Sequence, residues 1–584
     1  MTLTGSVADL VVVNGKIATQ DGRDSFVDAL AVRDGRIVAI GSDAEELARR
    51  SGTGRTIDVE GRTVVPGLTD THMHFVREGR HYLAELRWEG VATLAEAMER
   101  LRQQALRTPA GQWVRVVGGW SEYQFAERRV PTPAEIAEAA PQTPAFVLHT
   151  YQDASLNPPG LSAQKIGPAS APPAGGSIEH DPSGALTGRL LATPAATILY
   201  AAVAALPTLT RDQQVVSTLH YARELNRLGL TSVVDAGGGS QAFPEDYAVA
   251  TGIAQNRQLT VRVAYNLFTQ HPGHELEDFQ LWTRTLSPHE GDPMFQINGI
   301  GEQLVYTAAD YENFAQPRPV LEPRLEGELR EVVRFLVQQH WPFRLHATYG
   351  ESIERFLNVF EEVNDRDPLR QVRWFLDHAE TISDRDLDRV HRLGGGISIQ
   401  DRMAFQGEYC LRRYGEARAR DAPPIAKMLA KGIPVGGGTD ATRVASYNPW
   451  VNLEWLVTGQ TVGGLQLARP ENRLARPRAL RLVTADAAWF SSEEGMKGSL
   501  EVGRWADFAV LSSDYFSVPE HEIHRIESLL TVVGGQVVYA SGPFSALSPP
   551  PLPPVVPSWS PVAVYGSYEK GRSPGTSTSG TSTS

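Results

Sequence analysis

Short apolar runs separated by turn residues characterise the first 64 residues of the chain. The pair Asp34-Gly35 falls between two of these runs, which predicts a hairpin with a two-residue turn. Runs of apolar and β-branched residues at turn-bounded spacing are typical of strands. The expected strands are residues 8–14, 28–33, 36–40 and 55–59.

From residue 65 to residue 483, short apolar runs alternate with longer segments of helical periodicity. This alternation is typical of parallel α/β proteins, and eight such units close into a TIM-like (β/α)8 barrel. The eight expected strands are residues 65–74, 145–150, 232–236, 295–302, 343–347, 373–378, 396–400 and 434–440. Residues 114–118 and 261–266 are also strand candidates, so the assignment of the eight stays open. Helices are expected at residues 94–106, 212–228, 326–339, 353–362, 384–393 and 425–431.

Residues 484–544 return to β character, and the pair Gly534-Gly535 between two apolar runs is a hairpin signal. A β-rich start and a β-rich end around a barrel predict one small β-sandwich made from both ends of the chain. We therefore expect a sandwich of residues 1–64 and 484–544 beside a barrel of residues 65–483. Residues 545–584 are rich in proline, serine and threonine, which predicts a disordered or loosely attached tail.

Composition narrows the classes of partner. The chain has 584 residues, a formal net charge of −13 and 41% hydrophobic residues. This charge opposes binding to nucleic acid or to an anionic membrane, so a small-molecule substrate is expected, with the oligomeric state, a homo-oligomer included, left open. The single cysteine, Cys410, excludes an intrachain disulfide. The first residues lack a signal-peptide pattern, and we expect a cytoplasmic protein.

Candidate chemistry concentrates where predicted strands end. In Asp70-x-His72-x-His74, residues two apart on a strand point to the same side, so both imidazoles can bind one metal ion with a carboxylate nearby. His346, His378 and Asp440 also end predicted strands. In a barrel these ends converge on one face, where neutral nitrogen and carboxylate ligands suit a catalytic divalent ion.

The expected ion is zinc, as one ion or two. A divalent ion lowers the pKa of a bound water towards about 7 and polarises a substrate carbonyl. A nearby carboxylate can then carry a proton to the leaving group, and Asp440 is the candidate for this role.

The chain resembles the amidohydrolase superfamily, and more narrowly its amidohydrolase-3 branch, which includes formamide deformylase-like and exoenzyme-regulator-like proteins. The resemblance covers roughly residues 8–543. It rests on Pro66-Gly67-Leu68-x-Asp70-x-His72-x-His74, Gly438-Thr439-Asp440, the stretch Gly498–Leu511, and shorter matches at residues 118–122, 230–238 and 448–450.

The resemblance implies roles for these residues. His72 and His74 would bind a first metal ion. His346 and His378 would bind a second ion, or complete the first site and contact substrate. Asp440 would be both ligand and general base, with His378 as a second catalytic candidate.

One position departs from the branch pattern. Members of the branch often carry a lysine on the fourth strand that is carbamylated and bridges two metals, and Gln296 falls where this lysine is expected. Glutamine cannot be carbamylated, so a single ion, or two ions without this bridge, is expected. Glu302, six residues further on, either supplies a carboxylate instead or caps the next helix.

Other residues are pocket candidates by position only: His149, Trp120, Glu122, Tyr306, Gln400, Arg402 and Arg443. Cys410 has no basic partner motif, which favours a buried inert thiol. The leading hypothesis is a metal-dependent hydrolase of carbon–nitrogen bonds in amides or cyclic amides. The alternatives are a weakly active or inactive relative with a regulatory role, and a metal-assisted isomerase or lyase on the same scaffold.

Overall fold

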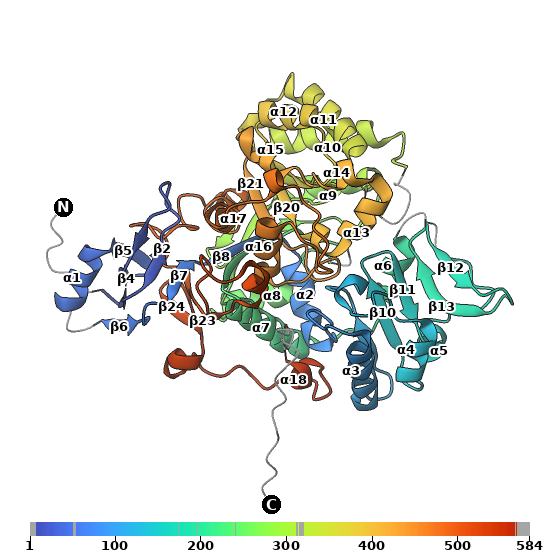
Figure 1. Cartoon of the computed structure of the whole chain (residues 1–584). Coiled ribbons are helices and arrows are strands. Elements are labelled where there is room, and N and C mark those ends of the chain that lie inside the picture. Colours follow the sequence, from blue (N-terminus) through green and yellow to red (C-terminus); the bar gives the residue numbers. More distant parts are fainter. Residues whose placement is uncertain are drawn as a thin grey trace, which may run out of the picture.

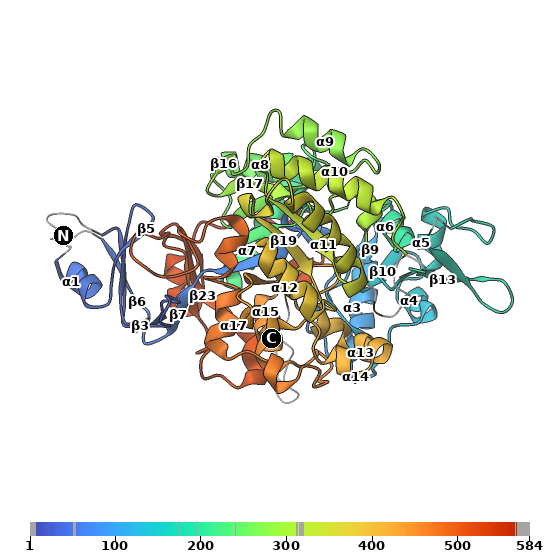
Figure 2. The same ribbon diagram turned by 90° about the horizontal axis from the view of Figure 1, so that it is seen from above.

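The structure is a computed structural model of the chain, and it describes residues 8–50, 54–172, 175–193, 196–239, 241–310, 314, 320–566 and 568. Figures 1 and 2 show a central barrel with a smaller β-rich region on each of two opposite sides. One of these regions combines the blue and the orange-red parts of the chain, and the other is the teal segment. Among the described residues, no helix combines the length and the apolar character needed to cross a membrane.

The barrel has eight parallel strands, which confirms the predicted fold. Each strand pairs in parallel with the next, and a bridge between Met73 and Ala441 brings the last strand back to the first. In order around the barrel they are β8 (Leu68–Met73), β14 (Leu230–Asp235), β15 (Arg262–Leu267), β17 (Phe295–Ile300), β18 (Phe343–Ala347), β19 (Trp374–His378), β20 (Gly396–Gln400) and β21 (Val435–Gly438). Their carboxyl ends meet at one face.

Helices surround the barrel and pack their apolar faces against it. α11 (Gly350–Asn364), for example, buries Ile353, Phe356, Phe360 and Val363, which lie three or four residues apart on one face. The other helices around the barrel are α2 (Phe75–His81), α7 (Arg211–Arg227), α8 (Ala248–Gln255), α9 (Glu275–Trp282), α10 (Leu325–Gln338), α12 (Asp384–Leu393), α13 (Arg402–Tyr414), α14 (Glu416–Ala419), α15 (Ile425–Ala430), α16 (Pro449–Thr458) and α17 (Arg476–Leu482).

Two strand predictions need correction. Residues 145–150 form no barrel strand: β10 (Ala145–His149) turns directly into β11 (Asp153–Leu156) as an antiparallel hairpin, and no crossover helix follows it. The candidate at 261–266 takes its place in the barrel as β15. An apolar run shows that a strand forms but does not show which sheet it joins.

The predicted strand at residues 65–74 is also divided. Its first part belongs to β7 (Thr63–Pro66), which pairs with β22 (Phe508–Leu511) outside the barrel, and only β8 enters the barrel. The division falls at Gly67, where a Cβ atom would lie 2.0 Å from Oγ1 of Thr231. Only glycine allows this close approach of the backbone to the neighbouring strand.

The sandwich is made from both ends of the chain, as predicted. One sheet contains β5 (Arg36–Ile40), β4 (Leu30–Arg33), β1 (Leu10–Val13) and β6 (Arg55–Asp58), and α1 (Ser42–Arg50) lies beside it. The other contains β24 (Gln536–Ala540), β23 (Ser528–Val533), β22, β7, β2 (Lys16–Ala18) and β3 (Phe26–Val27). Val12 and Ile17 from the start of the chain share a buried core with Phe508 and Leu530 from its end. Each such side chain contributes about 1.5–3 kcal/mol by burial.

A second small sheet, which the sequence pattern did not separate from the barrel, interrupts the chain between α2 and α7. Its strands are β9 (Val114–Val116), β10, β11, β12 (Ser177–His180) and β13 (Leu186–Leu191), and its helices are α3 (Leu94–Arg107), α4 (Pro133–Ala139), α5 (Pro158–Ala163) and α6 (Thr197–Ala204). The turn after β10 reaches the barrel, where the Tyr151 hydroxyl accepts a hydrogen bond from Arg443 Nη1 at 3.0 Å. Arg443 follows the end of β21, so the inserted sheet borders the strand ends.

The predicted disorder from residue 545 is wrong for the part of the tail up to residue 566. The Pro553 carbonyl lies 2.9 Å from Nε2 of His220, and the Trp559 carbonyl accepts a hydrogen bond from Gln104. Buried Ser560 donates a hydrogen bond to the Leu83 carbonyl, and α18 (Val562–Tyr565) comes next. Proline-rich chain needs few hydrogen-bond partners of its own, so it can lie along a groove without forming a sheet. Residues 569–584 lie outside the described residues.

Candidate metal centre

Six candidate ligands converge at the carboxyl ends of the barrel strands. His72 lies on β8 and His74 follows its last residue. His346 lies on β18, His378 ends β19, Glu302 follows β17 and Asp440 follows β21. Two groups of three, His72–His74–Asp440 and His72–Glu302–His378, have ligand atoms within 4.8 Å of one another, and every member is buried. The ends of parallel strands thus bring together residues that lie far apart in the chain.

His72 is the centre of the cluster. Its Nε2 atom lies 3.5 Å from Oε2 of Glu302 and 3.5 Å from Oδ1 of Asp440, and among the described residues it has no hydrogen-bond partner. The side chain is fully buried. A buried polar nitrogen without a partner is rare, because leaving it unsatisfied costs about 1–3 kcal/mol.

Asp377 and Arg344 hold the other side of the His72 ring. Nδ1 of His72 lies 3.0 Å from Oδ1 of Asp377 and 2.7 Å from Nη2 of Arg344. Nε of Arg344 donates to Oδ2 of Asp377 at 2.8 Å. In the tautomer whose Nδ1–H donates to Asp377, the Nε2 lone pair faces Glu302 and Asp440. In metal-binding histidines, the ring nitrogen that does not bind the metal commonly donates a hydrogen bond to a carboxylate.

Negative charge dominates the electrostatics around His72. Burial alone would lower its pKa, but the carboxylates of Asp377, Asp440 and Glu302 outweigh burial and raise it to about 9. The excess of carboxylate around one imidazole favours a positive charge at this position, which either a proton or a metal ion can supply.

The remaining ligands form two groups of contacts. Nε2 of His74 lies 3.1 Å from Oδ1 of Asp440, and Nδ1 of His74 contacts the Gly237 carbonyl. Nδ1 of His346 lies 3.2 Å from Oε2 of Glu302 and 2.9 Å from Nε2 of His378. These contacts leave both carboxylates facing imidazole nitrogens.

Burial would raise the pKa of each of these two carboxyl groups, but the histidines outweigh it. His72 and His74 hold the pKa of Asp440 well below its usual range. His72, His346 and His378 do the same for Glu302. Burial and neighbouring His346 lower the pKa of His378, which favours its neutral form. The site therefore offers ionised carboxylates as ligands or bases.

Asp70 supports the ligands without joining them. Its Oδ1 accepts hydrogen bonds from the backbone N–H groups of His72 at 2.9 Å and Thr439 at 3.1 Å, and its Oδ2 accepts from the Thr439 hydroxyl at 2.6 Å. It thus links the ends of β8 and β21 and fixes the backbone that carries His72 and Asp440. Burial raises its pKa to about 6.

The structure places Gln296, which falls at the expected lysine position, away from the candidate ligands. Gln296 lies near the start of β17, where its Nε2 donates to Oε1 of Glu493 at 2.9 Å. It is six residues, about 20 Å of extended chain, before Glu302. Glu302 is the residue of this segment that reaches the cluster, and the next helical turn begins after Val305, so Glu302 does not cap it. Gln296 itself therefore lies away from the cluster, because strand parity does not fix the distance along a strand.

Most other predicted pocket residues lie outside the cluster. His149 and Glu122 pair at 3.0 Å in the inserted sheet, with Trp120 against the His149 ring. Tyr306 donates to the Thr269 carbonyl at 3.1 Å. Gln400 does reach the cluster, since its Oε1 lies 2.5 Å from Nδ1 of His378. Cys410 is buried, and burial raises the pKa of its thiol to about 12, as expected for an inert cysteine.

Sequence reasoning missed Asp377 and Arg344. Both are fully buried charged residues inside strands whose other residues, apart from His346 and His378, are apolar. A charge in the middle of a buried strand is rare unless it is paired, and this was the available signal.

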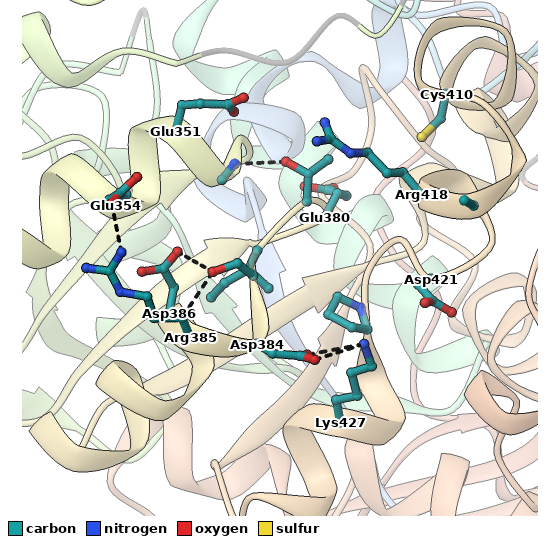
Figure 3. A pocket seen from close by; sticks show the side chains of 16 residues that line it. Glu351, Glu354, Glu380, Asp384, Arg385, Asp386, Cys410, Arg418, Asp421 and Lys427 are labelled. Carbon is teal, nitrogen blue, oxygen red and sulfur yellow. Dashed lines mark hydrogen bonds and ion pairs between the residues drawn. The ribbon is translucent and has the colours of Figure 1, made fainter.

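A polar cavity of about 440 Å³ is lined by residues of α11, α12, α14 and α15, and Figure 3 shows its lining. Its charges are largely matched: Asp384 contacts Lys427 at 3.2 Å and Glu354 contacts Arg385 at 3.3 Å. Buried Glu380 in its lining is paired with Arg402 at 2.5 Å. None of the six candidate ligands lines this cavity, so we assign it no part in the chemistry.

A (β/α)8 barrel with histidines and carboxylates clustered at its strand ends is typical of metal-dependent hydrolases. A family model described as Amidohydrolase family matches residues 55–539, and the chain belongs to the Amidohydrolase family. It is 26% identical over 552 residues to N-substituted formamide deformylase of Arthrobacter pascens, covering 91% of this chain and 98% of that protein.

Two solved structures have a similar fold. An uncharacterized metal-dependent hydrolase from Pyrococcus furiosus has a TM-score of 0.62 and 21% sequence identity, covering 87% of this chain and 100% of that chain. A mutant of atrazine chlorohydrolase TrzN from Arthrobacter aurescens TC1, complexed with zinc and atraton, has a TM-score of 0.51 and 15% identity, covering 91% and 95% of the two chains.

Proposed function

We propose that the protein hydrolyses the carbon–nitrogen bond of a small non-peptide amide or cyclic amide, with zinc as its divalent ion. The observation that carries this proposal is the Nε2 atom of His72, which is buried, has no partner among the described residues and lies 3.5 Å from each of two carboxylates. Without a cation, this arrangement leaves a polar nitrogen unsatisfied and two negative charges close together.

The donor set fits a divalent ion of zinc type. Imidazole nitrogens and carboxylate oxygens are ligands that zinc prefers, and the absence of thiolate or thioether groups from the six residues argues against copper(I). His72, His74, His346, His378, Glu302 and Asp440 would hold the ion. A divalent ion bound here would supply Lewis acidity, lowering the pKa of water and polarising a carbonyl group.

The number of ions depends on His72. Both groups of three ligands use His72, and one Nε2 lone pair can bind only one ion. We therefore favour a single ion. If two ions bind, Glu302, and not a carbamylated lysine, would be the carboxylate ligand available to both, since its Oε2 atom lies 3.5 Å from Nε2 of His72 and 3.2 Å from Nδ1 of His346.

Asp440 is the proposed general base. Its ionised carboxylate takes a proton from the attacking water at an oxygen atom and gives it to the leaving nitrogen, so the amide splits into an acid and an amine. His74 at 3.1 Å holds this carboxylate in place, and Asp70 fixes the backbone beneath it. His378 is the second candidate for proton transfer, because its lowered pKa keeps it neutral and able to accept a proton.

The similarity to an N-substituted formamide deformylase supports an acyclic amide as the first substrate class to test. Zinc-loaded protein should be assayed against N-substituted formamides, lactams, cyclic imides and esters, with Asp440→Asn as the matched control. We expect turnover of at least one amide class, and none in the control above background. Activity on esters alone, or isomerisation or elimination without hydrolysis, would contradict the proposal. No turnover by zinc-loaded protein of any of these substrates would favour the inactive relative.

A further inference from the structure

Outside the metal centre, the buried carboxylate of Glu89 lies at the wall of a cavity that has both polar and apolar lining residues. The cavity has a volume of about 290 Å³ and lies between the loop before α3, α13 and α16. Val91, Phe405, Val451, Val462 and Tyr568 form apolar parts of its wall. None of the six candidate metal ligands lines it.

Glu89 is the acidic side chain in this cavity that lacks a hydrogen-bond partner among the described residues. It is 2% exposed, and among the described residues neither of its carboxylate oxygens has a hydrogen-bond partner. Nη1 of Arg87 lies 3.7 Å from Oε1 of Glu89, but Arg87 donates its hydrogen bond to Glu85 at 2.6 Å. Burial raises the pKa of Glu89 to about 8, although Arg87 opposes this.

The other polar side chains around the cavity are satisfied. His524 and Glu454 pair at 2.7 Å. Gln124 donates to the carbonyls of Trp88 at 2.7 Å and Val91 at 2.9 Å. Among the described residues, Glu89 is therefore the one carboxylate lining the cavity that has no hydrogen-bond donor.

The backbone makes room for the Glu89 carboxylate. Gly119 has a φ of +73°, and a Cβ atom at this position would lie 2.5 Å from Oε1 of Glu89. The chain thus combines a glycine in a conformation that other residues rarely adopt with a carboxylate that contacts it directly. Both features place an acceptor at the cavity wall.

We propose that this cavity is a second ligand site, and that it binds a small primary ammonium ion with a hydrocarbon substituent. The ammonium group would donate hydrogen bonds to Glu89, and the substituent would lie against Phe405, Val451 and Tyr568. A buried carboxyl group stays ionised only beside a cation or several donors and otherwise takes up a proton, so an ammonium ion bound here would stabilise the ionised form of Glu89. An apolar cavity of about 150 Å³ already holds a benzene molecule. The amine that the proposed hydrolysis releases has this chemistry, but the site does not depend on that activity.

The direct test is calorimetric titration with 2-phenylethylammonium, using 2-phenylethanol as the neutral probe of the same shape. We expect the amine to bind the wild-type protein and Glu89→Gln to weaken this binding by about 10- to 100-fold, the value of one charge-assisted hydrogen bond. The alcohol should bind both proteins equally and weakly. Glu454→Gln removes a carboxylate of the same cavity that is already paired, so it should change amine affinity by less than about 3-fold.

Two outcomes would overturn the proposal. Absence of amine binding to the wild type would mean that only water fills the cavity, and unchanged binding to Glu89→Gln would place the amine elsewhere. Glu89→Gln replaces a buried acid, whose raised pKa already favours its neutral form, with a neutral amide of similar size, so its melting temperature should stay close to that of the wild type. If this variant nevertheless fails to fold, Val462→Trp is the second test, because a larger side chain at the half-buried Val462 would fill the cavity and leave Glu89 unchanged. Loss of amine binding in Val462→Trp would support the site, and retained binding would overturn it.

Discussion

At the scale of single residues, the proposed role of Asp440 as general base can be tested directly. Asp440→Asn keeps the size of the side chain and one oxygen ligand but cannot accept a proton. We expect kcat to fall by at least about 10²-fold, the usual value of a general base, with metal content and fold retained. Steady-state kinetics on a verified substrate and metal analysis of the same sample check this. A variant with nearly wild-type kcat would transfer the role of base to His378 or Glu302.

Asp377 is a positioning residue, and its effect should show in metal affinity. It lies 3.0 Å from Nδ1 of His72 and is buried with Arg344. Asp377→Asn should weaken metal binding by about 10- to 100-fold, as measured by competition with a chelator.

The matched control for Asp377 is Glu122→Gln. Glu122 contacts His149 at 3.0 Å in the inserted sheet, so it is also a buried carboxylate behind a histidine, but it is not next to a candidate ligand. The control should leave metal affinity unchanged. An equal loss in both variants would indicate a general loss of stability instead of a specific effect on His72.

The residues of the site could be predicted unevenly, and the reason is physical. His72 and His74 lie two apart on one strand, so parity alone places them together. Glu302 could not be distinguished from a helix cap, because its position depends on how far β17 extends. Asp377 and Arg344 meet His72 only through the closure of the barrel, which no local pattern encodes.

At the scale of elements, Asp514 connects the two ends of the chain in the sandwich. It accepts hydrogen bonds from Lys16 Nζ at 2.8 Å and from the Thr63 hydroxyl at 2.8 Å, and it lies just after β22. Partial burial alone would raise the pKa of Asp514, but the hydrogen bonds from Lys16, Ser517 and Thr63 outweigh burial and hold it at about 2.

The pH dependence of this contact has a definite sign. The folded-state pKa lies below the unfolded value of about 3.8, so the contact stabilises the fold above pH 3.8 and is lost as the pH falls towards 2. Because the side chains are partly exposed, we expect this contact to contribute about 1 kcal/mol to the free energy of unfolding. Asp514→Asn should lower the melting temperature at pH 6, and the difference from wild type should shrink below pH 3.8. A difference that is constant across this range would contradict the assignment.

Elements were predicted more reliably than their partners. The helix at residues 384–393 and the hairpin around Asp34-Gly35 result from periodicity and turn residues, and both form as expected. The run at residues 145–150 is equally apolar, but its neighbour β11 pairs with it directly and removes it from the barrel. Which sheet an apolar strand joins depends on the strands that lie beside it in space.

At the scale of the whole molecule, the structure has three regions: the barrel, the sandwich and the inserted sheet. The barrel supplies the six candidate ligands. The sandwich, built from strands near both ends of the chain, lies on one side of the barrel (Figure 1). The inserted sheet, on the opposite side, contacts the loop after Asp440 through Tyr151 and Arg443. The sequence indicated the first two regions, because their strands alternate with helices or lie at the ends of the chain. The third was hidden inside the alternating pattern.

The most direct test of this account is the metal content of the protein and of its His72→Ala variant. Both should be purified without chelator, loaded with zinc, freed of excess ion and measured by elemental analysis, with circular dichroism as the check on folding. The account predicts about one tightly bound divalent ion per chain in the wild type, and loss of this ion from a folded His72→Ala variant. A wild-type protein without stoichiometric metal, or a variant that retains its ion, would contradict the assignment of His72 as the centre of the site.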